Sequence, residues 1–210
     1  MNEFEKALRG YFGPAALAKI QQVRVGIAGA GGLGSNCAQF LARSGFRNFK
    51  IVDFDEVEYS NLNRQCFFFH QVGETKVAAL KKNLLQINPD IRVDTLQVKI
   101  EPDNIGTLFE DSHAVIEALD RPEYKKLVVE SYLLSGKLLV AASGLAGWGN
   151  TDAIKIRKVK EHFYLVGDLV SEVQPHCPPV APAVVITAAK QADVVLSYFL
   201  GKCEVKENDR

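Results

Sequence analysis

The sequence predicts an α/β fold with a mainly parallel sheet, helices on both of its faces, and a C-terminal antiparallel hairpin followed by a final helix. Three observations lead to this prediction: apolar strand-like runs alternate with helical patterns, a glycine-rich turn follows the first apolar run, and the pattern changes after Gly149. Alternating strands and helices favour a parallel sheet covered on both faces. We assign residues 1–210 to one domain, in which 1–22 are helical, 23–145 form a nucleotide-binding core, and 146–201 contain the hairpin, a crossover loop and the last helix.

In the core, strands and helices are expected to alternate regularly. Residues 3–21 carry a helical apolar pattern that breaks near Gly13 and Pro14. The elements predicted after it are a strand over 23–28, a helix over 32–45, a strand over 49–52, an irregular segment over 55–72, a helix over 74–87, a strand over 92–98, a short helix opened by Pro102, a strand over 114–118, a helix over 122–135 and a strand over 138–142. A proline or a glycine ends several of these patterns, as is usual for helix boundaries.

The C-terminal part has a different pattern. Residues 153–159 and 162–166 alternate or cluster as in an antiparallel hairpin. Residues 168–182 contain four prolines and no periodicity, which predicts an extended loop. The run 183–200 is apolar and helical and is closed by Gly201.

Composition narrows the class of protein. The chain has 210 residues, 47% of them hydrophobic, and a formal net charge of zero. A neutral chain gives no general attraction to nucleic acid or membranes, and we find no signal peptide and no apolar run of about 20 residues. Cys37, Cys66, Cys177 and Cys203 are widely spaced, which favours reduced thiols and gives no zinc-binding pattern. We therefore expect a cytoplasmic protein without zinc.

The glycine turn predicts a nucleotide site. Gly29, Gly31 and Gly34 satisfy G-x-G-x-x-G directly after a strand and at the start of a helix. The first glycine permits a tight turn, the second lets a phosphate approach the backbone, and the third permits close packing of helix on strand. Asp53 follows the next strand, where a carboxylate can accept hydrogen bonds from ribose hydroxyls. The turn alone does not choose between NAD and ATP.

The segment after Asp53 favours ATP. It reads EVEYSNLNRQCFFFHQVGETK and places Arg64 and Lys76 just beyond the expected ribose site. Two cations can neutralise a triphosphate, with arginine engaging phosphate bidentately and lysine acting as a point charge. Asn61 can help to fix its orientation. The alternative is a solvated polar loop.

These motifs occur together in one family. The sequence G-x-G-G-L-G, then VDFDEVEYSNLNRQ, then VGETK and EALDRPEYK, resembles the ThiF/MoeB/HesA family, the bacterial relatives of ubiquitin-activating enzymes, over residues 5–201. The short length and the lack of zinc-binding cysteine pairs are most similar to the compact ThiF branch. The resemblance implies a homodimer that uses ATP and Mg²⁺ to adenylate the C-terminal carboxylate of a small ubiquitin-like sulfur carrier of the ThiS type, the step that thiamine biosynthesis requires.

The resemblance also implies roles for individual residues. Those assigned to nucleotide binding are Gly29, Gly31, Gly32 and Gly34 in the turn, Asp53 at the ribose, and Asn61, Arg64 and Lys76 at the phosphates. Arg64 and Lys76 would also stabilise charge during the reaction, and Asp120 would bind magnesium. Because Asp120 follows a predicted parallel strand, it is expected at the sheet edge where ligands bind. Its alternative role is to cap the helix that Pro122 begins.

Two further positions are less securely matched. Arg9 is the available N-terminal arginine that could reach a partner subunit's ATP; otherwise it is a surface residue. Cys177 lies beside His176 in the proline-rich loop, where it could act on the carrier or on sulfur from a donor protein, or could be an unreactive loop residue. The Pro178-Pro179 pair is expected to keep this loop extended. The run Phe67–Phe69 could line a dimer or carrier surface, or be buried.

Three other functions remain open on the sequence. An NAD-dependent oxidoreductase would use the glycine turn and Asp53 but has no evident use for the segment that follows. A related dehydratase that activates a carboxyl group on transfer RNA would share the ATP motifs but should carry a basic tract for RNA, and we find none in the sequence. A non-catalytic scaffold would have no reason to keep Asp53, Arg64, Lys76 and Asp120 together.

Overall fold

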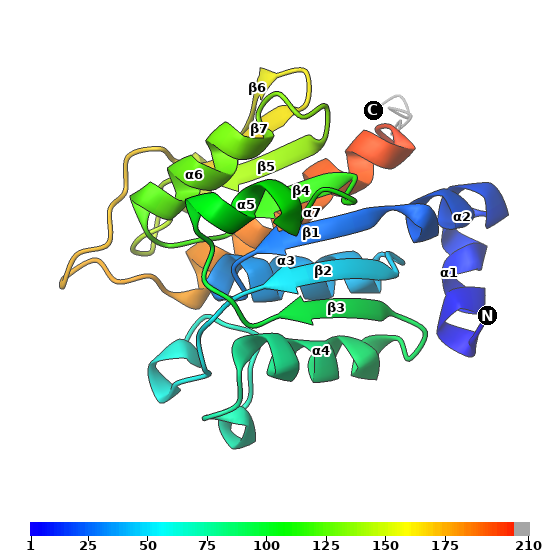
Figure 1. The fold of residues 1–210 in the computed structure, drawn as a ribbon, viewed down its shortest axis with the longest axis horizontal. Helices are drawn as coiled ribbons and strands as arrows, with labels where there is room; N and C mark the ends of the chain where they lie inside the picture. The colour runs from blue at the N-terminus through cyan, green and yellow to red at the C-terminus, as the bar shows by residue number, and fades with distance from the viewer. Residues whose placement is uncertain (204–210) are drawn as a thin grey trace, which may run out of the picture.

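The computed structural model describes residues 1–203, and these form two helical layers around one seven-stranded sheet (Figure 1). The helices are α1 (Glu3–Phe12), α2 (Pro14–Gln22), α3 (Gly32–Arg43), α4 (Lys76–Ile87), α5 (Pro102–Leu108), α6 (Pro122–Tyr132) and α7 (Ala181–Leu200). The strands are β1 (Arg24–Ala28), β2 (Asn48–Val52), β3 (Arg92–Leu96), β4 (Ala114–Glu117), β5 (Leu138–Ala142), β6 (Lys155–Lys160) and β7 (Phe163–Gly167). Short 3₁₀ helices cover Tyr59–Asn61, Phe69–Gln71 and Thr151–Ala153.

The sheet confirms the predicted fold class. Its strand order is β3-β2-β1-β4-β5-β7-β6. The pairs β1–β2, β1–β4, β2–β3, β4–β5 and β5–β7 are parallel, whereas β6 pairs antiparallel with β7. From β1 the chain continues to β2 and β3 on one side of β1. It then returns and adds β4 and the later strands on the other side. In a doubly wound sheet this reversal opens a crevice at the carboxyl ends of the strands.

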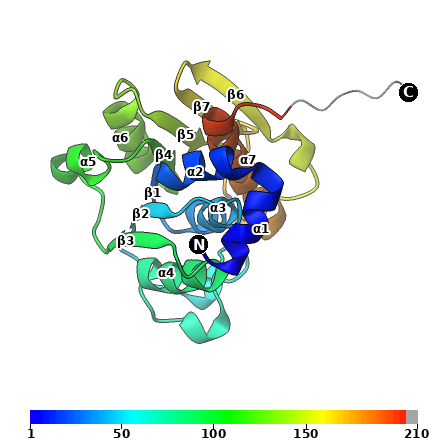
Figure 2. The same cartoon turned by 90° about the vertical axis from the view of Figure 1, so that its right-hand side faces the viewer.

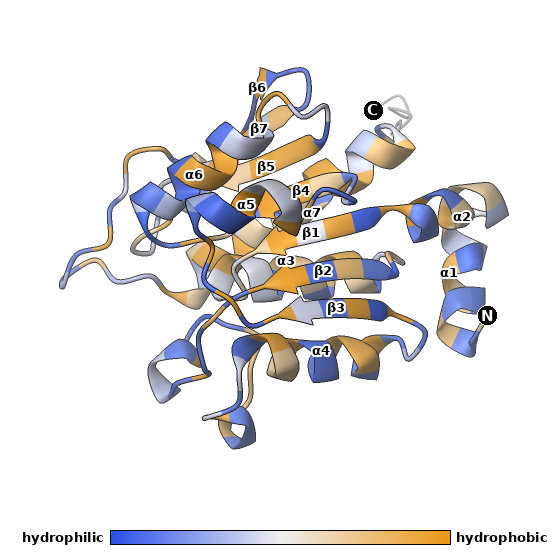
Figure 3. Cartoon of the chain, viewed as in Figure 1, coloured by the Kyte–Doolittle hydropathy of each residue, from blue (hydrophilic) through white to orange (hydrophobic). Residues whose placement is uncertain are grey.

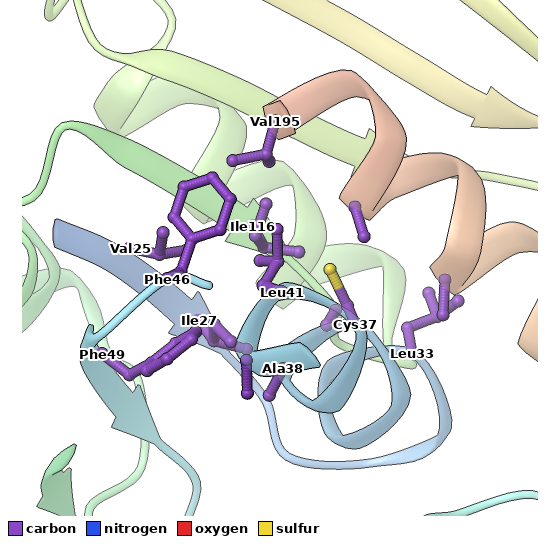
Figure 4. Packing of buried hydrophobic residues seen from close by; sticks show 14 of the residues in the cluster. Val25, Ile27, Leu33, Cys37, Ala38, Leu41, Phe46, Phe49, Ile116 and Val195 are labelled. Carbon is purple, nitrogen blue, oxygen red and sulfur yellow. The ribbon is translucent and has the colours of Figure 1, made fainter. Parts of the chain in front are cut away.

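Helices cover both faces of the sheet, as Figure 2 shows, with α5 and α6 on one side and α3 and α7 on the other. The larger cluster of buried apolar residues joins α3 and α7 to the strands. Figure 4 shows Cys37 and Leu41 of α3 near Ile116 of β4 and Val195 of α7. A smaller cluster under α5 and α6 includes Phe109, which is fully buried. The central strands β4 and β5 are hydrophobic in Figure 3, as expected where both faces are covered, whereas β2 and β3 also carry hydrophilic residues.

The final helix corrects one expectation. We predicted no apolar run of membrane-spanning length, but α7 has 20 residues and a mean hydropathy of 1.4, which is long and apolar enough by composition to cross a membrane. Within the structure, Ala188, Ala192 and Val195 of α7 are buried in the larger cluster against α3. Small residues on this face let two helices approach closely, so packing accounts for the composition of α7.

The N-terminal helices lie at the amino ends of the parallel strands, opposite the segments that follow β1 and β2 (Figure 1). Glu5 of α1 is buried, accepts a hydrogen bond from Asn88 and pairs with Arg47 over 3.0 Å. Arg9, on the same helix, is exposed. The helix that carries it lies at the opposite end of the sheet from the glycine turn (Figure 1).

Candidate functional site

The glycine turn has the geometry that its sequence predicts. Gly29 has a φ of +98°, and a Cβ there would lie 2.8 Å from the carbonyl oxygen of Ala118. A Cβ at Gly34 would lie only 1.8 Å from the Gly29 carbonyl oxygen, so Gly34 is required for close packing of α3 on the turn. At Gly31 the nearest atom to a Cβ would be 3.8 Å away, which leaves the backbone open to a ligand. Gly31 precedes the first turn of α3, whose N–H groups favour an anion.

Asp53 is fixed by the glycine turn. Its Oδ2 accepts from the Ala30 N–H over 2.6 Å, and its Oδ1 accepts from the Asp55 N–H over 2.8 Å. Burial raises the pKa of Asp53, and the two backbone N–H groups and the charge of Lys76 oppose that rise. The carboxylate is thereby held in one orientation beside the turn, ready to accept further hydrogen bonds.

A cavity of about 910 Å³ opens at the carboxyl ends of β1, β2 and β4. Its walls include eight of the predicted site residues: Gly29, Gly31, Gly32, Asp53, Asn61, Arg64, Lys76 and Asp120. Gly34 lies behind the wall, and Cys177 is not part of it. The volume is large enough for a nucleotide with part of a second substrate. Residues from four separate sequence motifs thus meet in one place.

The segment after β2 is tied to α3. Asn36 of α3 donates to the Arg64 carbonyl oxygen over 2.8 Å, and the Cys66 N–H donates to Ser35 over 3.0 Å. The guanidinium of Arg64 donates to the Ser60 carbonyl and to Asn63. Because these contacts are on the cavity wall and exposed, phosphate oxygens can replace them. The segment is ordered, and Ser60 and Asn63 within it remain exposed to solvent.

Asn61 has a structural role that the sequence did not reveal. Its side chain accepts from the Glu58 N–H over 3.1 Å and caps the short helix Tyr59–Asn61. The side-chain oxygen is therefore already used, while the amide group has only a long contact of 3.4 Å with Ser60. Asn61 therefore has N–H groups to offer to a nucleotide.

Lys76 is buried and has a partner that sequence reasoning missed. Its ammonium lies 2.6 Å from the carboxylate of Asp55, whose backbone carbonyl also accepts from the Lys76 N–H. The Lys76 side chain is 9% exposed, whereas that of Asp55 is 46% exposed. The signal for this pair was the second acid in VDFDEV, directly after Asp53. Asp55 occupies the place beside Lys76 where a phosphate oxygen would otherwise neutralise its charge.

Asp120 lies exposed on the cavity wall, three residues after the end of β4. The N-cap of α6 is Arg121, without a side-chain capping bond, so the helix-capping role considered for Asp120 is wrong. No ion pair among residues 1–203 involves Asp120. No three His, Cys, Asp or Glu side chains in this range gather as a metal site. A single open carboxylate fits Mg²⁺ that arrives with substrate phosphates.

The cysteines differ in their surroundings. All four are free thiols. Burial raises the pKa of Cys37, and it also raises the pKa of Cys66, although Arg43 opposes the latter. Cys177 is half-buried, and its Sγ would lie 2.7 Å from a Cβ at Gly147. The expectation of an extended chain at Cys177 is wrong, because Gln174 and Cys177 exchange backbone hydrogen bonds of 3.2 and 2.9 Å and form a tight turn.

The aromatic run divides between core and surface. Phe67 is buried, whereas Phe68 and Phe69 are exposed. The ring of Phe69 lies against that of exposed Tyr59, with 5.2 Å between centroids. Burial therefore describes Phe67, whereas a dimer or carrier surface at Phe68 and Phe69 stays a prediction.

Residues 5–210 match the model of the ThiF family. The chain belongs to this family. Curated relatives include "Adenylyltransferase and sulfurtransferase" proteins: UBA4 of Yarrowia lipolytica, 34% identical over 64% of this chain, and uba4 of Ogataea parapolymorpha, 33% identical over 64%. The matches cover 34% and 35% of those proteins, so the chain spans about one third of their length.

Solved structures share the fold over nearly the whole chain. E. coli tRNA N6-threonylcarbamoyladenosine dehydratase, TcdA, in complex with ATP, has a TM-score of 0.81 and 21% identity, covering 94% of this chain and 92% of that one. E. coli MccB with ATP has a TM-score of 0.70 and 22% identity, covering 96% of this chain and 64% of that one. At these identities the likeness concerns the fold alone.

Proposed function

We propose that this ThiF-family chain is an ATP-dependent adenylyltransferase that activates the C-terminal carboxylate of a small ubiquitin-like sulfur carrier of the ThiS type, as in thiamine biosynthesis. The observation that carries the proposal is the single cavity in which the glycine turn, Asp53, Arg64, Lys76 and Asp120 meet. The names of the curated relatives, which include adenylyltransferase activity, support it. The family assignment leaves the NAD-dependent alternative without support.

In the proposed reaction, an oxygen of the carrier carboxylate attacks the α-phosphorus of ATP. The bond from that phosphorus to the bridging oxygen breaks, and pyrophosphate leaves with the electron pair. Asp53 would orient the ribose, and the open backbone at Gly31 would receive phosphates at the start of α3. Arg64 and Lys76 would oppose the negative charge that develops on the phosphates. Positioning and charge stabilisation are sufficient for such a transfer.

Asp120 is the residue that would hold Mg²⁺. The ion would supply further charge stabilisation at the phosphate oxygens. The exposed carboxylate on the cavity wall, without an ion-pair partner among residues 1–203, supports this assignment. Lys76 would exchange Asp55 for a phosphate oxygen as ATP binds.

A homodimer in the cytoplasm is part of the same proposal. Arg9 is exposed on α1, at the end of the sheet opposite the cavity (Figure 1). It could therefore reach a nucleotide only in a second copy of the chain. Sedimentation at micromolar concentration tests the oligomeric state.

The activity is tested by exchange of labelled pyrophosphate into ATP, in the presence of a ThiS-type carrier. A carrier that lacks its C-terminal glycine or other terminal residue serves as the matched control. We expect exchange only with the intact carrier, because truncation leaves the attacking carboxylate one residue short of the α-phosphorus. Exchange that is equally fast with the truncated carrier, or absent with every ubiquitin-like carrier tried, contradicts the proposal.

One observation favours a second candidate, carboxyl activation on transfer RNA. The edge strand β6 carries Lys155, Arg157, Lys158 and Lys160 and is largely exposed, although no basic tract was expected from the sequence. Lysines on an edge strand also prevent strand pairing between molecules, which is the simpler explanation. Binding of transfer RNA that weakens steeply with salt and with Lys158→Gln would favour the second candidate.

A further inference from the structure

A buried ion pair lies directly beneath the turn that carries Asp120. Glu117, the last residue of β4, is fully buried, and Lys125 on α6 is 24% exposed. The Lys125 ammonium lies 3.0 Å from Oε1 and 2.8 Å from Oε2 of Glu117. Sequence analysis assigned no role to either residue, although an acid at the end of an apolar strand is itself unusual.

Both partners also bind the backbone of the turn. Oε1 of Glu117 accepts from the Leu119 N–H over 2.8 Å, and the Lys125 ammonium donates to the Leu119 carbonyl oxygen over 3.0 Å. That carbonyl belongs to the peptide unit that joins Leu119 to Asp120. From the opposite face of the sheet, Gln191 of α7 donates to the Glu117 backbone carbonyl over 3.2 Å. Lys125 therefore holds the peptide unit directly before Asp120, and Glu117 holds the peptide unit before that one.

Stability alone does not account for this arrangement. A buried ion pair is often no more stabilising than apolar residues of similar volume, because both charges must leave water. Apolar replacements would, however, leave the N–H and the carbonyl oxygen of Leu119 without these partners. The Lys125 ammonium uses two of its three N–H donors, for Oε1 of Glu117 and for the Leu119 carbonyl oxygen, while Oε2 of Glu117 lies 2.8 Å away in the ion pair without a hydrogen bond.

We infer that Glu117 and Lys125 are positioning residues that hold Asp120 in the orientation needed to bind a divalent cation with ATP. This inference rests on the proposed metal and nucleotide site. The pair contributes no net charge, because Glu117 neutralises Lys125 next to the cavity. Removing Glu117 alone would release the Lys125 ammonium toward Asp120 and the phosphates, where it would compete with the cation.

The test uses Mn²⁺ as a paramagnetic substitute for Mg²⁺. Its binding to the complex of the full chain with ATP is followed by electron paramagnetic resonance in Glu117→Gln, Lys125→Met and the double variant. ATP binding without metal is measured by calorimetry in the presence of EDTA. Lys126→Met is the matched control, because Lys126 is the next residue on α6, is 73% exposed and pairs only with Glu130 at 3.7 Å.

We expect Mn²⁺ affinity to fall on the order of 10- to 100-fold in all three variants, as for other residues that orient metal ligands. Metal-free ATP binding and the control should remain as in the wild type. The double variant matters most, because it leaves no unpaired buried charge. Wild-type Mn²⁺ affinity in the double variant overturns the inference.

Loss of metal-free ATP binding in the double variant overturns it too, since the pair would then support the fold rather than Asp120. The proposed function fails separately. If the wild type binds ATP and Mn²⁺ but exchanges no pyrophosphate with any carrier, adenylation is wrong while the positioning role stands.

Discussion

The nucleotide cavity and the loop around Cys177 are built in different ways. In the cavity, polar groups are held by neighbouring elements: Asp53 by backbone N–H groups of Ala30 and Asp55, Lys76 by the carboxylate of Asp55, and the turn before Asp120 by the side chains of Glu117 and Lys125. Cys177 lies in a tight turn with backbone contacts to Gln174 and does not line the cavity. Preorganised groups suit the chemical step, whereas an irregular loop suits contact with a changing partner.

Replacing Asp120 with alanine should have the largest effect on pyrophosphate exchange. We expect a loss of roughly 10²- to 10³-fold, comparable to removing one group that stabilises transition-state charge. The unfolding temperature should not change, because the side chain is exposed and forms no ion pair within residues 1–203. Glu123→Ala, in the first turn of α6, is the control. Near-normal exchange in Asp120→Ala would show that this carboxylate is not the metal ligand.

Replacing Lys76 with methionine should cost about 10²-fold in kcat for exchange. Methionine resembles the apolar part of the lysine side chain, so the substitution mainly removes the positive charge beside the phosphates. Lys82→Met on the same helix is the control, because Lys82 is exposed and pairs with Glu74 at the surface. A change confined to KM for ATP would mean that Lys76 binds the ground state and the transition state equally, and that its role is only in binding.

A prediction with a smaller expected effect concerns Asp53 and the pH dependence of the free energy of unfolding. Burial raises its pKa in the folded chain. Its contribution to the free energy of unfolding is therefore complete below the unfolded pKa of about 4 and is lost as the pH rises through the folded pKa. The difference in unfolding free energy between the wild type and Asp53→Asn should thus decrease as the pH rises above about 4. An increase would show that the bonds from Ala30 and Asp55 outweigh burial.

The sequence predicted the fold well because the fold depends on local patterns. Apolar runs, Gly29 and Gly34 are constrained by packing within a few residues, and the structure places them as expected. The sequence could not predict which residues become partners only because the fold brings them together in space. Glu117 and Lys125 are eight residues apart and meet only because α6 packs over β4, and Lys76 meets Asp55 across the whole irregular segment.

The errors also have physical causes. Helix capping by Asp120 was a plausible alternative, but Pro122 begins α6 with Arg121 at the N-cap, one residue later than that role requires. Around Cys177, the prolines were expected to keep the chain extended. They remove backbone donors only at their own positions, so the N–H groups of Gln174 and Cys177 were still able to close a turn.

The smallest expected effect concerns Cys177 and separates the two regions. Cys177→Ser should leave pyrophosphate exchange nearly unchanged, because the thiol lies outside the cavity wall and the attack on ATP requires no sulfur nucleophile. If the thiol takes part in sulfur delivery, the same variant should fail to form the carrier thiocarboxylate when a sulfur donor is present. Cys203→Ser is a suitable control, since Cys203 is an exposed thiol near the chain end.

Measuring both steps on this one variant distinguishes three results. Loss of thiocarboxylate formation alone assigns Cys177 to sulfur transfer. Loss of neither step makes it an ordinary turn residue beside Gly147. Loss of both would mean that the turn from Gln174 to Cys177 helps to seat the carrier or ATP, since a serine cannot reproduce the packing of Sγ against Gly147. In that case the two regions act together in adenylation, and the contrast between a rigid cavity and an independent loop is wrong.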